Sequence, residues 1–191
     1  MKTIGVIMAG GESTRFGEDK SLYKVDNKVM YTHVSEMLDS TGVCDDIVVS
    51  TNERLKDAFH LKTVVDAFEN CGPVGGLYSV SRSYPKDRLI VVSCDTPFVT
   101  KEWIHILLEQ AEKTPDRIII SAEDRRQHPL VGVYQGRDLT DRLKQQIDAG
   151  RLSMRALFDN MNVTEVNIGK YQLKTDIFRN INYKSDIDGG V

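Results

Sequence analysis

A glycine-rich segment near the amino terminus joins an apolar run to two basic side chains. Gly10 and Gly11 follow the apolar residues 4–8, and Arg15 and Lys20 come shortly after them. Glycine lets backbone N–H groups approach an anion closely, and two cations neutralise a polyphosphate. The residue types therefore predict a phosphate-binding loop. For this segment alone, an ordinary strand-to-helix turn with solvated basic residues is the alternative.

The spacing of the loop excludes two common nucleotide-binding motifs. A P-loop has Gly-x4-Gly-Lys-Ser/Thr, whereas five residues separate Gly11 from Gly17 here and Lys20 comes three positions later. The dinucleotide fingerprint Gly-x-Gly-x-x-Gly also fails, because Gly10 and Gly11 are adjacent. The loop therefore belongs to another kind of phosphate site.

A carboxylate follows a second apolar run. Asp95 comes directly after residues 91–93 and Cys94, and Thr96 and Pro97 follow it. Mg²⁺ prefers oxygen ligands and commonly uses one or two protein carboxylates together with substrate phosphates. Asp95 is therefore the predicted metal ligand. The alternative is that its side chain caps the turn or the next helix.

Two further polar residues follow apolar runs in the same way. Asp66 comes after residues 63–65 and leads into the glycine-rich residues 72–77, and Asn52 comes after residues 47–50. Both side chains are predicted to contact a nucleotide, Asp66 through a base or ribose. Helix entry at the Gly-Pro pair and a helix start at Asn52 are the structural alternatives.

Short β-branched runs alternate with helix-length segments. Strands are predicted over residues 4–8, 47–50, 63–65, 89–93, 118–121, 130–134 and 164–167, and helices over 31–39, 53–59, 74–83, 101–112, 139–149 and 154–159. Near-continuous apolar runs suit strands that are buried on both faces. The alternation predicts a doubly wound, mainly parallel sheet in a Rossmann-like, three-layer α/β/α fold, with ligands at the carboxyl ends of the strands. The hydrophilic residues 123–129 are interpreted as an insertion that shapes an acceptor pocket.

Length and composition favour one domain over residues 1–191, without repeats or linkers. With 25 Lys and Arg against 28 Asp and Glu, the charge balance argues against a nucleic-acid partner. The three scattered cysteines favour a reducing cytoplasm. No apolar run reaches the length of a membrane span, so no membrane partner is expected.

Taken together, the segments resemble the molybdenum cofactor guanylyltransferases of the MobA family. Residues 8–20 are similar to its Leu-Ala-Gly-Gly-x-Ser-x-Arg-Met-Gly-x-Asp-Lys signature, residues 72–77 to Gly-Pro-Leu-Ala-Gly, and residues 94–97 to Cys-Asp-x-Pro. Residues 127–129 and 180–182 resemble later family elements, so the likeness covers nearly the full chain. Residues 183–186 depart from the family's Thr-Pro-Glu.

The resemblance implies transfer of GMP from GTP to molybdenum-bearing molybdopterin, with release of pyrophosphate. It implies Mg²⁺ as the cofactor, cofactor-handover proteins as partners, and a monomer or weak oligomer in the cytoplasm. The residues implied in catalysis are Arg15, Lys20 and Asp95. Those implied in GTP binding are Met8, Ala9, Gly10, Gly11, Lys20, Asn52, Asp66 and Asp95, while Asp95 also binds the metal.

Two later residues are implied as contacts of the acceptor or the active site. These are His128, for which a solvated charge run is the alternative, and Asn182. A molybdenum cofactor cytidylyltransferase or a sugar-phosphate nucleotidyltransferase is the alternative enzyme, and a non-catalytic nucleotide-binding regulator is the other alternative. The Gly10-Gly11 pair favours guanine, because cytidine users often carry Ala-Gly there.

Overall fold

The computed structural model describes residues 1–10, 19–182 and 186, Lys20 by its backbone alone. Within these residues, seven strands form one sheet in the order β5-β4-β1-β6-β8-β7-β9. β8 runs antiparallel to β6 and β7, and the other neighbouring pairs are parallel. The strand bounds are β1 Thr3–Met8, β4 Asp46–Thr51, β5 Lys62–Val65, β6 Arg88–Ser93, β7 Ile118–Glu123, β8 Arg126–Tyr134 and β9 Val163–Asn167.

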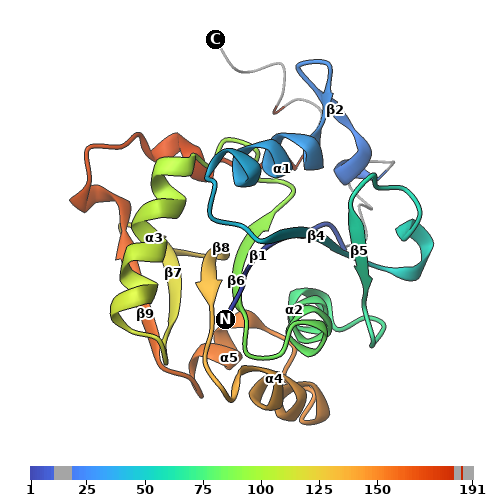
Figure 1. Ribbon diagram of the computed structural model, residues 1–191, viewed down its shortest axis with the longest axis vertical. Helices are drawn as coiled ribbons and strands as arrows, with labels where there is room; N and C mark the ends of the chain where they lie inside the picture. Colours follow the sequence, from blue (N-terminus) through green and yellow to red (C-terminus); the bar gives the residue numbers. More distant parts are fainter. Residues whose placement is uncertain (11–18, 183–185, 187–191) are drawn as a thin grey trace.

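Helices cover both faces of this sheet (Figure 1). α1 (Met30–Ser40) and α3 (Lys101–Lys113) lie on one face, and α2 (Gly72–Ser83), α4 (Leu139–Asp148) and α5 (Met154–Phe158) lie on the other. The remaining short elements are the 3-10 turns η1 (Lys20–Leu22), η2 (Glu53–Leu55), η3 (Ile168–Lys170) and η4 (Thr175–Phe178), and the strands β2 (Lys24–Val25) and β3 (Lys28–Val29). The predicted doubly wound, mainly parallel, three-layer α/β/α fold is confirmed.

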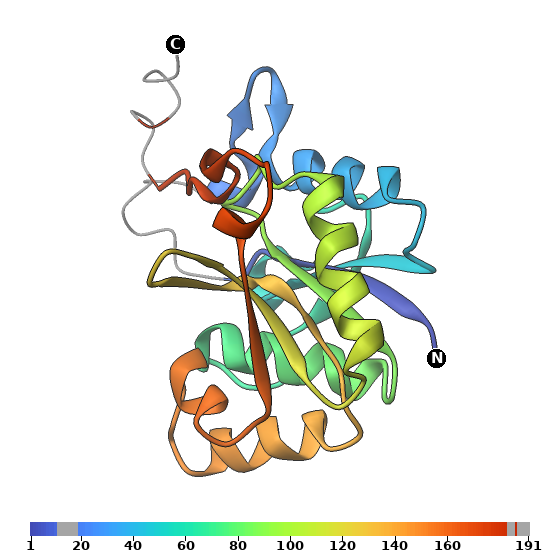
Figure 2. The same cartoon turned by 90° about the vertical axis from the view of Figure 1, so that its left-hand side faces the viewer.

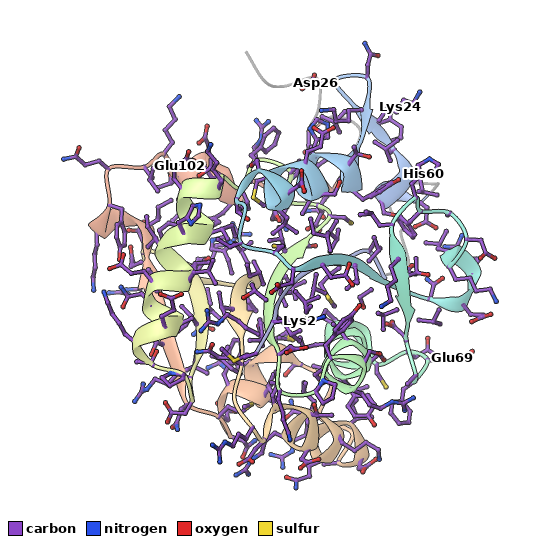
Figure 3. All side chains as sticks on the ribbon, viewed as in Figure 1. Lys2, Lys24, Asp26, His60, Glu69 and Glu102 are labelled. Carbon is purple, nitrogen blue, oxygen red and sulfur yellow. The ribbon has the colours of Figure 1, made fainter. Side chains whose placement is uncertain are left out.

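The β2–β3 hairpin stands apart from the main sheet and projects from the body of the molecule (Figure 2). Lys24 and Asp26 mark this projection among the side chains (Figure 3). Asp26 and Asn27 turn the chain with φ values of 50° and 63°. Positive φ at two central residues is typical of the tight turns that join antiparallel strands.

Successive strand residues pack into two cores, one on each side of the sheet. In β1, Val6 and Met8 pack with α2 and α4, whereas Ile7 packs with α1 and α3. Val91 and Val92 of β6 divide between the two cores in the same way. Burial on both faces explains why the strands are almost continuously apolar in the sequence.

The chain reverses its direction of travel across the sheet at β1. From β1 it passes to β4 and β5 on one side, and then returns through α2 to β6 on the other side. Met8 lies opposite Ser50 in β4 and opposite Ser93 in β6, so the carboxyl ends of the three strands are level. In an open α/β sheet, ligands bind outside the strand ends at such a reversal.

The predicted helix over residues 53–59 is wrong. The Leu55 N–H donates to the Asn52 carbonyl at 3.2 Å and the Ala58 N–H to the Leu55 carbonyl at 2.9 Å, which is the i to i+3 spacing of tight turns. Phe59 then packs edge-on against Tyr31, with ring centroids 5.0 Å apart. The aromatic contact and the tight turns replace a regular helix.

Residues 123–129 belong to a β-hairpin of the main sheet, and their interpretation as an insertion that shapes an acceptor pocket stays a prediction. β7 continues to Glu123, and β8 begins at Arg126. The register shifts because Ile120 pairs with Gly132 whereas Ser121 pairs with His128, which leaves residues 129–131 as a bulge. Bulges redirect side chains, and His128 is the last paired residue before this one.

The other predicted strands and helices occur with modest changes at their ends. Thr100 and Ser153 cap α3 and α5 as their sequence positions indicate, accepting hydrogen bonds from the N–H groups of Trp103 and Ala156. In the part of the chain that the structure describes, no helix combines the length and apolar character that a membrane span requires.

Candidate functional site

The structure brings four residues from separate strand ends to one edge of the sheet. Gly10 follows β1, Asn52 follows β4, Asp66 follows β5 and Asp95 follows β6, and these four strands are neighbours. We refer to these four residues as the rim. The prediction that the segments converge at the carboxyl ends of parallel strands is confirmed by this arrangement.

The backbone at the end of β1 is held by both neighbouring strands. The Ala9 N–H donates to the Ser50 carbonyl at 2.9 Å, and the Cys94 N–H donates to the Met8 carbonyl at 3.1 Å. The Ala9 carbonyl and the Gly10 amide are therefore the first backbone groups beyond this ladder. They are the groups from which the predicted phosphate loop begins.

Several predicted residues fall in the loop that follows. Gly11 and Arg15 lie outside the described residues, as does the side chain of Lys20, whose backbone begins η1. Their roles in phosphate binding stay predictions. Asp19, at the end of this segment, forms an ion pair with Arg54 of η2, and the Asp19 side chain is largely buried. The loop therefore returns to the protein body beside the end of β4.

The carboxylate of Asp66 lies against two glycines. A Cβ atom at Gly10 would lie 3.2 Å from Asp66 Oδ2, and one at Gly76 would lie 3.3 Å from Asp66 Oδ1 and 2.6 Å from Ser50 Oγ. Such separations are too short for an unstrained side chain. A side chain at Gly76 would therefore force its neighbours to move, and one at Gly10 would press on the Asp66 carboxylate.

Three hydrogen bonds fix Asp66. Its N–H donates to the Thr51 carbonyl at 2.9 Å, and the next N–H, that of Ala67, donates to Ser79 Oγ at 2.8 Å. Ser50 Oγ donates to Asp66 Oδ1 at 3.4 Å. Both the backbone and the carboxylate are therefore oriented before any ligand binds.

Burial raises the pKa of Asp66 to about 6, and the hydrogen bond from Ser50 opposes this rise. A carboxyl in an apolar site favours its neutral form, because ionisation there is not compensated by water. At neutral pH the group is still mostly ionised. It is then a poorly hydrated hydrogen-bond acceptor, which suits it to bind N–H donors of a ligand.

Asn52 caps the short turn that follows β4. Its Oδ1 accepts a hydrogen bond from the Leu55 N–H at 3.2 Å. Because the oxygen is used by the cap, a ligand would meet the amide N–H₂ donors of this side chain. The alternative that Asn52 starts a helical turn is therefore confirmed for its role as a cap. Its predicted contact with a nucleotide stays a prediction.

Asp95 occupies a tight turn at the end of β6. The N–H and the hydroxyl of Thr96 donate to the Ser93 carbonyl at 3.1 and 2.9 Å, and this holds the turn. The Ile181 N–H donates to the Asp95 carbonyl at 2.9 Å, so the carboxyl-terminal segment lies directly beside the turn. Asn182, the next residue, is thereby held near this turn, and its predicted contact with the acceptor or the active site stays a prediction.

The oxygen donors here suit a hard cation. Asn182 donates its N–H to Asp186 Oδ2 at 2.7 Å, which adds a second carboxylate near the turn. No group of three or more His, Cys, Asp or Glu able to hold a metal ion occurs among the described residues. One or two carboxylates completed by substrate phosphates are typical of Mg²⁺ rather than of a metal enclosed by protein.

His128 is buried, with 7% of its surface exposed. Its ring stacks on Phe178 at 4.3 Å between centroids, and its Nε2 lies 3.7 Å from Glu123 Oε2, which is beyond hydrogen-bond distance. Burial and the nearby Arg126 charge lower the pKa of the imidazole. The solvated charge run is therefore not its environment, and the predicted contact with an acceptor stays a prediction.

Two serines that support Asp66 were missed by the sequence analysis. Ser50 is the last residue of β4 on the face that carries Val48, and Ser79 lies about one turn after Gly75 and Gly76 in α2. Two-residue and helical periodicity place both serines toward the interface of α2 with the sheet. A serine at such an interface is a signal of a functional contact. It can be recognised only once it is known that α2 packs on β4.

A hollow of about 770 Å³ lies at the opposite end of the parallel strands. It is lined near the starts of β7 and β9 by residues that include Asp116, Arg137 and Arg142. These charged side chains are exposed and of mixed sign. The hollow thus lacks the converging strand ends and the fixed polar groups of the rim.

A model of the MobA-like NTP transferase domain matches residues 5–165. The chain belongs to this family. Nucleotidyl transfer is the activity class of MobA-like NTP transferase domains, and the matched span includes all four rim residues.

Solved structures share this fold over nearly the whole chain. Molybdopterin-guanine dinucleotide biosynthesis protein A from Archaeoglobus fulgidus is 21% identical, with a TM-score of 0.81 over 97% of this chain and 95% of that one. A putative protein from Aquifex aeolicus is 28% identical, with a TM-score of 0.74 over 95% and 94%. CMP:2-keto-3-deoxy-manno-octonic acid synthetase, solved with CTP, is 16% identical, with a TM-score of 0.73 over 98% and 96%. These likenesses show that the chain shares its fold with proteins whose names differ in the nucleotide chemistry that they describe.

Replacement of Asp66 by Asn is expected to stabilise the protein at about pH 8 but not at about pH 4. The folded-state pKa of about 6 exceeds the ordinary value of 3.8, so the ionised carboxylate lowers stability as the pH rises between these values. Asn carries no charge and can still accept from Ser50. Thermal unfolding midpoints at both pH values measure the effect, with Asp57→Asn as an exposed control. An equal change at both pH values would contradict this account of Asp66.

Proposed function

We propose that this protein transfers GMP from GTP to molybdenum-bearing molybdopterin, forming a guanine dinucleotide cofactor and pyrophosphate. The observation that carries the proposal is the rim, which places Asn52 and Asp66 beside the glycine loop and Asp95 on the next strand end. Membership of the MobA-like NTP transferase family supports nucleotidyl transfer. The likeness to the Archaeoglobus fulgidus protein supports the molybdopterin acceptor.

The choice of base rests on the polar groups of the rim. Guanine carries two kinds of N–H donor, on N1 and N2, beside the acceptor O6, whereas cytosine has its single N4 donor group. The half-buried carboxylate of Asp66 is an acceptor with two oxygens, and Asn52 presents amide donors because its oxygen caps η2. This pairing of acceptor and donor favours guanine. A cytidylyltransferase or a sugar-phosphate nucleotidyltransferase is the alternative.

The reaction makes modest demands on protein side chains. An oxygen of the acceptor phosphate attacks the α-phosphorus of GTP, a new P–O bond forms, and the bond to the β-phosphate oxygen breaks. The acceptor phosphate is already an anion, so a covalent nucleophile or strong base is not required. Charge neutralisation and in-line alignment are the main requirements. We assign neutralisation of the triphosphate and the leaving pyrophosphate to Arg15 and Lys20.

Asp95 would hold Mg²⁺, with Asn182 and Asp186 as neighbouring polar groups. A bound Mg²⁺ neutralises phosphate charge and orients the substrate. The turn fixed by Thr96 and the hydrogen bond from Ile181 orient the backbone that carries Asp95. Together with His128, these residues would form the side of the site that receives the acceptor. A monomer or weak oligomer that hands its product to recipient proteins completes the proposal.

Turnover with GTP and with CTP, compared side by side, tests the proposal. The purified protein is incubated with Mg²⁺ and molybdenum-loaded molybdopterin, and pyrophosphate and dinucleotide are measured. We expect the guanine dinucleotide to form at least about tenfold faster than the cytosine one, which corresponds to about 1.4 kcal/mol in the barrier. Preference for CTP, or no product with either nucleotide, would overturn the assignment.

Asp95→Ala is expected to lower turnover by about a hundredfold or more, because metal stabilisation of phosphate charge contributes several kcal/mol. The fold should persist, since Asp95 contributes its backbone carbonyl rather than its side chain to the bond with Ile181. Asp116→Ala removes an exposed carboxylate far from the rim and is the matched control. Turnover by folded Asp95→Ala equal to that of the control would remove Asp95 from the metal site.

A further inference from the structure

Ser50 is a buried hydroxyl that touches Asp66 from the neighbouring strand. It is 1% exposed, and it pairs in register with Met8 near the end of β1. Its Oγ donates to Asp66 Oδ1 at 3.4 Å. Ser50 therefore lies beneath the rim, where it contacts a rim residue without belonging to the rim.

Helix α2 confines this hydroxyl. A Cβ atom at Gly76 would lie 2.6 Å from Ser50 Oγ and 2.8 Å from Met8 Cε. The absence of a side chain at Gly76 thus creates the space that the hydroxyl occupies. Because the helix backbone lies so close, Ser50 Oγ is packed against α2 while it faces Asp66.

The two oxygens of Asp66 face different partners. Oδ1 accepts from Ser50, and Oδ2 lies 3.2 Å from the position of a Cβ at Gly10. The backbone on either side is fixed by Thr51 and Ser79. With one oxygen held by Ser50, the other is directed toward the backbone from which the glycine loop starts.

We propose that Ser50 is a positioning residue that holds the Asp66 carboxylate so that Oδ2 meets the N–H donors of a bound purine base. The inference rests on the proposed function, because it takes Asp66 as the contact of the nucleotide base. In this proposal, the packing of α2 on β4 orients the Asp66 carboxylate toward the base. Bases with an N–H donor edge are the class it favours.

The hydroxyl also controls the charge of Asp66. A hydrogen bond donated to a carboxylate stabilises its ionised form, whereas burial favours the neutral form. Among the described residues packed against Asp66 from β1, β4 and α2, burial and Ser50 are the causes of its pKa shift, without a contribution from a charged side chain. Without Ser50, more of Asp66 would be protonated near neutral pH, and its acceptor strength would fall.

Ser50→Ala tests this role through the pH dependence of GTP binding. Calorimetric titration with GTP and Mg²⁺ is expected to show binding about threefold weaker than in the parent at pH 8.5, because Oδ2 is no longer held in place, and about tenfold weaker near pH 6.5, where more of the carboxyl is also protonated. In parallel, NMR of the Asp66 carboxyl carbon should show titration at a higher pH in the variant. A merely structural defect would weaken binding equally at both pH values.

Two variants provide the controls. Ser81→Ala removes a buried hydroxyl of α2 that does not contact Asp66, because it donates to the Tyr78 carbonyl of its own helix at 2.9 Å. This variant should change neither the affinity for GTP nor the titration of Asp66. Ser50→Cys replaces the hydroxyl with a slightly larger thiol that is a weaker donor, so it should give an intermediate shift even if Ser50→Ala folds poorly.

The possible failures are distinguishable. If the parent binds GTP and the titration of Asp66 is unchanged in both Ser50 variants, the inference is overturned while the proposed function stands. Equal weakening of GTP binding at both pH values also overturns the inference. If the parent itself binds no GTP, the proposed function fails, and the base-positioning role fails with it.

Discussion

The register of the parallel strands is the constraint on which the rest of this structure depends. Met8 lies opposite Ser50 on one side and Ser93 on the other, which levels the ends of β1, β4 and β6. Both faces of these strands are buried, so a slip of one residue would exchange the side chains of the two cores. The apolar packing therefore fixes where Gly10, Asn52 and Asp95 emerge. The rim residues lie far apart in the sequence, and they meet because the two cores permit only one register of the strands.

Close packing of α2 on the sheet accounts for the chemistry of Asp66. Gly76 leaves room for Ser50 beneath the helix, and Gly10 leaves room for the Asp66 carboxylate beside the start of the glycine-rich segment. Burial raises the pKa of Asp66 to about 6, so its ionised form costs stability at neutral pH. A site that tolerates such a cost is typical of functional residues, where acceptor strength matters more than the stability of the empty protein. The close packing at Gly10 and Gly76 thus holds the Asp66 carboxylate in the position from which we propose that it contacts the base.

Much of this arrangement could be predicted from the sequence, because buried parallel strands are nearly continuous apolar runs and polar residues mark their ends. The alternation of strands and helices, the rim residues that follow strands, and the caps at Thr100 and Ser153 follow from such local signals. Contacts between distant elements could not be predicted. Phe59 packs against Tyr31 instead of continuing a helix, and His128 stacks on Phe178 although the charged residues 123–126 lie just before it in the sequence. The extent of a single domain and the roles of Arg15 and Lys20 stay predictions.

The central claim is that the nucleotide binds at the carboxyl ends of β1, β4, β5 and β6. Backbone amide NMR spectra of ¹⁵N-labelled protein, recorded during titration with GTP and Mg²⁺, test it most directly. The account predicts that the largest shift changes occur at Gly10, Asn52, Asp66 and Asp95. Changes centred instead on the hollow near Asp116 at the opposite end of the strands, with the rim unaffected, would contradict it.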